Sequence, residues 1–239
     1  MSKINKKKGA LITLAWPQTL IPQENKWYDK LMQAIGILKD GYYKAGHSAL
    51  VLIDYSTGIA HYFDFGRYHA PYQHGRVRDS WSDPDLVIST RAIINGAGGI
   101  LNLEDILLEL SKNRASHGDG RLEASVEENI DFNQSYSFTK NMQAKGAIKY
   151  GPLEINGINC SRFVAATGKA SNINFLSQLA LHFPYTISVS PMLNVRVIGN
   201  TGFKYSVENN VFISKASIFT NLKMLVLGKE MTILKPQYS

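Results

Sequence analysis

The chain has 239 residues, of which 44% are hydrophobic and 19% are charged, enough apolar content for one folded core and too much for global disorder. None of its apolar runs approaches the roughly 18 residues of a membrane-spanning helix, so a transmembrane protein is excluded. The net charge is +7, but several of the lysines that contribute to it lie in the first eight residues: Lys3, Lys6, Lys7 and Lys8. We therefore expect a basic disordered tail over residues 1–9 and one domain over residues 10–235, with little reason to expect nucleic-acid binding.

The predicted elements begin with an apolar run over residues 10–16, which indicates a buried strand. Apolar residues recur every three or four positions over residues 25–39, which predicts an amphipathic helix that ends at Gly41. Residues 46–54 and 59–65 are strand-like runs on either side of a turn, so they predict a β-hairpin. Residues 66–84 are rich in Arg, His, Tyr, Asp and Pro without a period, which predicts a long functional loop.

The second half mixes helices and short strands. Strands are predicted over residues 86–90 and 122–126, and helices over residues 102–112, with Asn102 as cap, and 133–145. A further helix starts at Cys160 and stops at Gly168, before another over residues 171–182. The C-terminal part favours antiparallel strands over residues 185–189, 195–198, 211–214 and 222–227. Together these elements predict an α+β fold.

The chain has one cysteine, Cys160, so it cannot form an internal disulfide. This fits a reducing compartment. The N-terminus has basic residues before an apolar run, as a signal peptide does, but Trp16 and Pro17 interrupt the run without a cleavage site. We therefore expect the chain to be cytoplasmic.

Cys160 is the most informative residue because a cysteine at the start of a helix lies near unpaired backbone N–H groups that favour the thiolate. A lone cysteine is also a common buried apolar filler, so its position alone does not decide its role. His47 follows Gly46 at the start of a predicted strand, where the fold can hold a base for a thiol nucleophile. The two need only converge in space, whatever their separation in sequence.

Two short motifs, Gly-His-Ser-Ala-Leu-Val at 46–51 and Asn-Cys-Ser-Arg-Phe-Val at 159–164, resemble the circularly permuted NlpC-like papain-fold proteins, relatives of the YiiX-type and lecithin:retinol acyltransferase-like groups. The resemblance implies a papain-like fold, with an antiparallel sheet packed against the cysteine helix, and amidase, peptidase or acyltransferase activity. It also implies that Tyr150 helps to form the oxyanion site. The chain departs from the NlpC pattern at Asn159, where aspartate is usual, and at Arg162, which would crowd an approaching substrate.

The third member of the site has two candidates. Pairing across the predicted hairpin sets Ala49 opposite Asp64, which puts Asp64 on the face of His47 and His61 on the other face. The acyltransferase-like hairpin points to His61 instead, and a one-residue bulge at Gly58 would bring His61 to the face of His47. Both stay open, with Asp64 ahead because a carboxylate orients and stabilises a protonated imidazole.

Two further patterns are weak. The group His61, Asp64, His69 and His74 does not have the spacing of a metal site, so we expect no metal and no cofactor. The glycine-rich segment 96–99 is not followed by Lys-Ser or Lys-Thr, so we interpret it as a turn and not as a phosphate-binding loop.

The loop over residues 66–84 carries arginines that would suit an anionic group on a substrate, unless local ion pairs hold them. We expect Arg67 or Arg76 to lie within reach of Cys160. The sequence thus predicts a thiol hydrolase, an amidase or peptidase, that acts on a small-molecule or peptide substrate through Cys160 as nucleophile and His47 as base. The alternative is a catalytically inactive papain-like binding or scaffolding module with a buried Cys160. The sequence indicates no oligomeric state.

Overall fold

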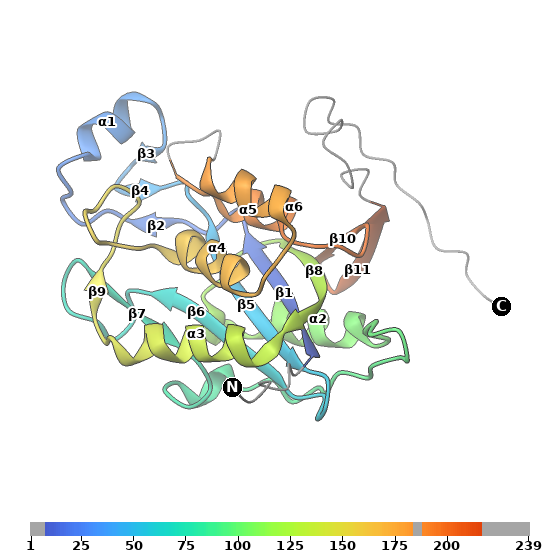
Figure 1. Ribbon diagram of the computed structural model, residues 1–239. Helices are drawn as coiled ribbons and strands as arrows, with labels where there is room; N and C mark the ends of the chain where they lie inside the picture. Colours follow the sequence, from blue (N-terminus) through green and yellow to red (C-terminus); the bar gives the residue numbers. More distant parts are fainter. Residues whose placement is uncertain (1–7, 184–187, 217–239) are drawn as a thin grey trace.

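The computed structural model describes residues 8–183 and 188–216, and its centre is an antiparallel sheet (Figure 1). The strand order is β11-β10-β8-β1-β5-β6-β7-β9. The strands are β1 (Lys8–Trp16), β5 (His47–Asp54), β6 (Ala60–Gly66), β7 (His74–Arg78), β8 (Leu122–Asp131), β9 (Ile148–Lys149), β10 (Phe203–Glu208) and β11 (Val211–Ala216).

Helices cover both faces of this sheet, so its central strands are buried on both sides (Figure 1). On one face Ala49, Val51 and Ile53 of β5 pack in the cluster that includes α2 (Leu103–Lys112). On the other face Leu50 and Leu52 pack in the cluster that includes α3 (Phe132–Ala144) and α4 (Cys160–Ala170). Successive side chains of a strand point to opposite faces, so β5 contributes to two cores at once. The predicted α+β class is confirmed.

Smaller elements complete the described part of the chain. Residues 17–46, which we call the N-terminal excursion, contain α1 (Asp29–Ala34) and a small sheet of β2 (Ile21–Pro22), β4 (Tyr42–Tyr43) and β3 (Leu38–Lys39). Two helices follow α4, namely α5 (Phe175–His182) and α6 (Pro191–Val197), and two 3-10 turns are η1 (Pro84–Leu86) and η2 (Arg114–Ser116). Among the described helices none is both long and apolar enough to cross a membrane.

Several predicted elements are confirmed, including the first strand, the hairpin and the helices that became α2 and α3. β1 begins at Lys8, so Lys8 and Gly9 lie in the sheet and not in the predicted tail. A Cβ on Gly9 would lie 2.4 Å from the Ile53 carbonyl oxygen, which explains glycine at this close approach. Residues 1–7 and the predicted domain end at 235 lie outside the described residues, so the domain bounds stay a prediction.

Other predictions were wrong in identifiable ways. The helix predicted over residues 25–39 is only Asp29–Ala34, because Gly36 takes a φ of +75° and breaks it before Leu38 joins β3. No strand forms over residues 86–90, and the supposed loop over 66–84 contains β7. Residues 195–198 belong mostly to α6, which starts at a Ser190 cap followed by Pro191. Residues 222–227 and most of the strand predicted over 185–189 lie outside the described residues.

Candidate active site

Cys160 is the first residue of α4 and is only 4% exposed. Asn159 caps the helix, and its side-chain oxygen accepts a hydrogen bond of 2.9 Å from the Arg162 backbone N–H. The cap holds the first turn in place and leaves Cys160 beside the positive end of the helix dipole. The asparagine that departs from the NlpC pattern therefore has a structural role here.

His47 is the first residue of β5 and is 3% exposed. Its ring stacks on the buried indole of Trp16, with ring centroids 5.8 Å apart. The preceding Gly46 has a φ of +69°, and a Cβ there would lie 3.0 Å from the Trp16 carbonyl oxygen. The tight turn before the strand and the stacked indole fix the imidazole from two sides.

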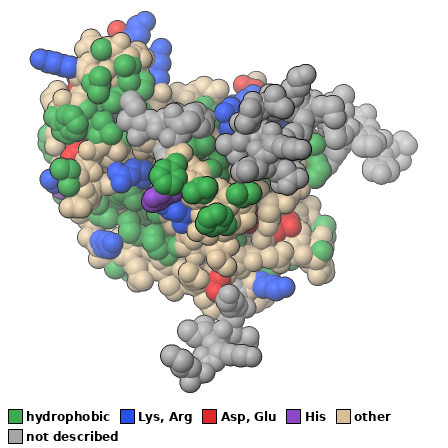
Figure 2. All heavy atoms as spheres, turned by 45° about the horizontal axis from the view of Figure 1, so that its top comes forward, with side chains coloured by type: hydrophobic (Ala, Val, Ile, Leu, Met, Phe, Trp, Pro, Cys, Tyr) green, Lys and Arg blue, Asp and Glu red, His purple; other side chains and the backbone are tan. Residues whose placement is uncertain are grey.

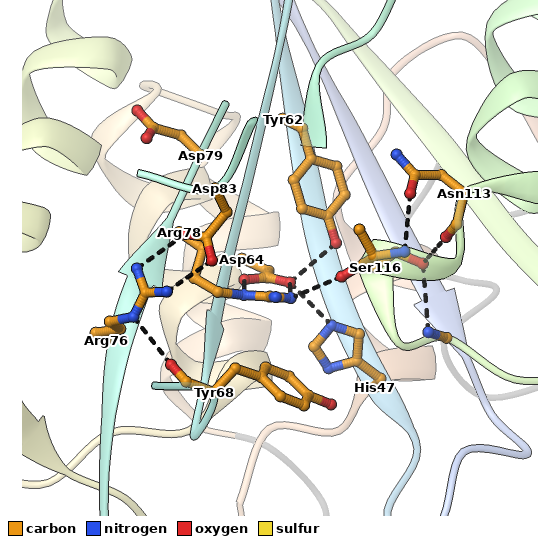
Figure 3. A network of polar contacts seen from close by, with 12 residues as sticks. His47, Tyr62, Asp64, Tyr68, Arg76, Arg78, Asp79, Asp83, Asn113 and Ser116 are labelled. Atoms are coloured by element: carbon orange, nitrogen blue, oxygen red, sulfur yellow. Dashed lines mark hydrogen bonds and ion pairs between the residues drawn. The ribbon is translucent and has the colours of Figure 1, made fainter. Parts of the chain in front are cut away.

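Asp64 lies on the same face of the sheet as His47, because β5 and β6 pair with Ala49 opposite Asp64. Nε2 of His47 is 3.4 Å from Oδ2 of Asp64 (Figure 3). The fully buried carboxylate also accepts hydrogen bonds from the Arg78 guanidinium, at 2.9 and 2.5 Å, and from the Tyr62 hydroxyl at 3.0 Å. Asp64 is thus held by three side chains, of which His47 is one.

This arrangement shifts the pKa values of the two groups in opposite directions. Burial by itself raises the pKa of Asp64, but hydrogen bonding to His47 and the charge of Arg78 outweigh it and lower the pKa to about 2. Burial by itself lowers the pKa of His47, but hydrogen bonding to Asp64 and to Cys160 outweighs it and raises the pKa to about 9. His47 is therefore protonated at neutral pH and Asp64 is ionised.

Cys160 is the negative partner of His47. Burial raises the pKa of the thiol, but hydrogen bonding to His47 and its charge outweigh burial, so the pKa falls below its usual range. Tyr150 also lowers the pKa of Cys160 through its side-chain hydrogen bond. Since Asp64 faces Nε2 of His47, Nδ1 is the nitrogen left for the thiol. The site therefore favours a thiolate–imidazolium pair.

Tyr150 comes to the sulfur from the segment between β9 and α4. Its ring stacks on Phe65 at 5.8 Å with an interplanar angle of 6°. Burial, followed by the charge of Cys160, raises the pKa of Tyr150 well above its usual value, so the hydroxyl keeps its proton. Tyr150 can therefore donate a hydrogen bond toward a developing negative charge.

Arg78 and Tyr62 are members of this network that the sequence interpretation missed (Figure 3). Arg78 pairs directly opposite Asp64 in β7, and its side chain is only 3% exposed. Its guanidinium also lies over the Tyr68 ring at 4.4 Å. Residues 66–84 were interpreted as a loop, so the alternation of β7, which could have placed Arg78 beside Asp64, went unused.

His61, the rival third group, lies on the opposite face of the sheet. It pairs with Leu52 without a bulge at Gly58, and its ring packs against Phe132 at 5.8 Å and Tyr136 at 5.1 Å. The structure thus brings Asp64 to His47 and keeps His61 away from it. In the described part of the chain no three His, Cys, Asp or Glu side chains are placed to hold a metal ion.

The three predicted substrate-binding arginines are in different places. Arg67 lines a cavity together with Cys160 and forms an ion pair of 3.0 Å with Glu24. Arg76 is not one of the lining residues of that cavity and instead forms two hydrogen bonds with Asp83, at 2.9 and 2.6 Å. Arg162 also lies outside the lining, with its guanidinium 3.4 Å from the Pro152 carbonyl oxygen, so it does not crowd the cavity.

The cavity has a volume of about 460 Å³. It lies between the N-terminal excursion, residues 150–152, residues 188–191 and the start of α4. In Figure 2 hydrophobic side chains gather at the upper left of the view, over the region where Figure 1 places α1 and β3. Cys160, Asn159 and Tyr150 belong to the wall, so the sulfur has a space that a substrate could enter.

Comparisons with known proteins bear on the fold and on the family. A search of curated proteins found no match. A crystal structure of the type VI secretion system effector TseH is similar, with a TM-score of 0.57 and 21% identity over 87% of this chain and 98% of that chain. At this identity the likeness concerns the fold, and it confirms the predicted papain-like arrangement with the cysteine at a helix N-terminus. The family model for TseH-like type VI secretion system effectors matches residues 11–174, and the chain therefore belongs to that family.

Proposed function

We propose that this protein is a cysteine hydrolase that cleaves an amide or ester bond through Cys160, His47 and Asp64. The observation that carries the proposal is the buried row of interacting side chains from the Cys160 thiol through His47 to Asp64, which ends at a cavity wall. A nucleophile, a base and a group that orients the base are the three parts that such chemistry requires.

In the proposed reaction the Cys160 thiolate attacks the substrate carbonyl, and a carbon–sulfur bond forms as the carbonyl electrons move to oxygen. The Tyr150 hydroxyl and backbone N–H groups at the start of α4 stabilise that oxyanion. When the tetrahedral intermediate collapses, the imidazolium of His47 gives its proton to the leaving amine or alcohol. Water then attacks the thioester with neutral His47 as base, which releases the acid and regenerates the thiolate.

Asp64 holds His47 in the orientation and protonation state that this cycle needs. Its carboxylate lies 3.4 Å from Nε2, which leaves Nδ1 toward the sulfur, and it stabilises the imidazolium for as long as Cys160 is a thiolate. Arg78 in turn keeps the carboxylate ionised although it is fully buried.

Family membership adds a cellular setting. Because the family is one of type VI secretion system effectors, we propose that the protein acts after export, and the cytoplasmic expectation is not retained. Its substrate would be a small molecule or a peptide. The sequence suggested that Arg67 binds an anionic substrate. Arg67 already pairs with Glu24, so it gives less support for a substrate of this kind.

The inactive binding module is the second candidate, and the low exposure of Cys160 is the observation that favours it. One experiment separates the two. Cys160 is the only cysteine, so alkylation by iodoacetamide reads a single site, and its rate can be followed from pH 5 to pH 10 by mass spectrometry.

We expect fast alkylation well below the ordinary thiol pKa of about 8.5, with the rate lost only as the pH falls through the lowered pKa of Cys160. Hydrolysis of p-nitrophenyl acetate should follow the same acid limb. It should then decline as the pH rises through about 9, where His47 loses its proton. Alkylation that rises only around pH 8.5, without ester hydrolysis, would identify the inactive module.

A further inference from the structure

The cavity beside Cys160 has walls that are mostly apolar. Apolar lining residues come from the N-terminal excursion, from residues 150–152 and from the segment that leads into α6. The side chains that matter here are Ile21, Tyr28, Met32, Ile37, Tyr43 and Val189. Tyr28 and Met32 are buried and pack with Leu38 in a small core of the excursion, so this wall is formed in advance and not assembled by the ligand.

The charged side chains that reach the cavity are largely neutralised by one another. Arg67 pairs with Glu24 at 3.0 Å, and Lys26 pairs with Glu154 at 3.5 Å. The Lys26 side chain is only 6% exposed, so this pair is nearly withdrawn from solvent. The remaining charged residue of the lining, Lys44, is exposed. An anionic group in the cavity would have to compete with Glu24 for Arg67 and with Glu154 for Lys26.

The volume of about 460 Å³ falls within the range of about 300–1,000 Å³ that is typical of small-molecule sites. A space of this size lined by carbon favours a ligand that gains by leaving water, since apolar burial grows with the area removed from solvent. Cys160 lies in the wall, so the ligand's reactive carbonyl would be at one side and its apolar part would fill the rest.

We propose that this cavity binds an uncharged apolar acyl group of the substrate, next to the carbonyl that Cys160 attacks. The proposal rests on the proposed function, because it assigns the occupant of the same site. It also selects among substrates: short or charged acyl groups leave the apolar wall unfilled and react slowly, whereas longer aliphatic or aromatic ones are held and react faster.

The experiment uses the single cysteine and does not depend on hydrolysis. N-ethylmaleimide and N-octylmaleimide carry the same reactive group and differ only in their apolar chain. The alkylation rate of Cys160 in the full chain is measured for each, and each rate is divided by that of the same reagent with glutathione. Because both reagents attack the same thiolate, their ratio reports the cavity and not the activation of the sulfur.

We expect the normalised rate of N-octylmaleimide to exceed that of N-ethylmaleimide by about tenfold or more, since each buried methylene adds apolar contact. The I37W variant, which fills the cavity, should reduce this ratio to about twofold. The I35W variant is the matched control, because Ile35 is 49% exposed and lies outside the lining. Thermal unfolding of both variants checks that each is folded.

A wild-type ratio near one would overturn the inference, and so would a reduction of equal size in both tryptophan variants. The anionic alternative is measured with iodoacetate against iodoacetamide, again normalised to glutathione. A preference for iodoacetate would also overturn it. If both maleimides react slowly at pH 6 although their ratio is large, the proposed function fails while the apolar site stands. If both maleimides react fast at pH 6 and their ratio is near one, the apolar site fails while the proposed function stands.

Discussion

The two histidines of the β5–β6 hairpin lie on opposite faces of one sheet and have different surroundings. His47 meets Asp64 and Cys160, and it stacks on Trp16. His61, one strand away, packs on the aromatic rings of α3. Their local sequences are similar, since each stands next to alanine or serine in a run of apolar residues.

The difference shows that strand register decides which histidine belongs to the polar network. A shift of one residue in the pairing of β5 and β6 would exchange the faces of Asp64 and His61. The composition of the hairpin would be unchanged, but His47 would lose its carboxylate. The candidate site therefore depends on the turn that sets the register as much as on the residues that take part in it.

The largest expected effect comes from exchanging each histidine for asparagine in turn. H47N removes the proton-carrying group beside the thiolate, so we expect ester hydrolysis to fall by about 10³-fold or more and alkylation at pH 6 to slow to the rate of an ordinary thiol. H61N, the matched control, should keep activity within a few fold. A comparable loss in both variants would contradict the assignment of the two faces.

Removing the partner of Asp64 tests how the carboxylate is held. R78M leaves a fully buried charge without its main counter-ion, so we expect the free energy of unfolding to drop by about 3–5 kcal/mol in urea titrations. The pKa of Asp64 should rise at the same time. If R78M instead leaves the free energy of unfolding unchanged, Arg78 does not stabilise the buried carboxylate. The double variant R78M/D64N should then be no more stable than R78M.

The turn that sets the register can be strained directly. Gly58 has a φ of +69°, and a Cβ there would lie 2.5 Å from the Ala92 carbonyl oxygen. We expect G58A to cost about 1–3 kcal/mol of unfolding free energy, measured by thermal or urea unfolding. G36A is the control, because Gly36 has a similar φ of +75° but open space around it. Equal losses would mean that backbone strain alone, and not the contact, accounts for the effect.

The smallest effect concerns pH. The folded-state pKa of Asp64 is about 2, below its ordinary value of 3.8, so this carboxylate adds stability at pH values above 3.8. That contribution, about 2 kcal/mol, should be lost as the pH falls through about 2. Unfolding followed between pH 5 and pH 2 should show a smaller acid loss in D64N than in the wild type. Parallel curves would show that Asp64 is not stabilised in its ionised form.

Much of the polar site could be predicted because it depends on local patterns. A turn of defined length and a period of two place Asp64 opposite Ala49, and a polar residue before a helix places Cys160 at its start. These rules concern neighbours in the sequence. The same rules failed at α6, where the apolar residues Val195 and Ile198 suggest a strand while the Ser190 cap starts a helix.

Other parts of the site were missed for two different reasons. Arg78 lies on the strand that follows β6, and it was missed because residues 66–84 were interpreted as a loop, so the pairing of β7 with β6 was not expected. The apolar cavity depends on distant segments, since its wall joins residues of the N-terminal excursion with Val189. A contact between segments more than a hundred residues apart depends on the packing of the whole chain, which residue spacing does not encode.

The charges of the candidate site alternate from one contact to the next. The sequence of groups is Arg78, Asp64, His47 and Cys160, positive and negative in turn, and it sums to zero. Moving the proton between imidazole and sulfur leaves the summed charge unchanged, so these four groups together produce little electric field at a distance. Dissolved salt screens only fields that extend into solvent. The chemical step should thus be nearly indifferent to ionic strength, although the chain as a whole carries a net charge of +7.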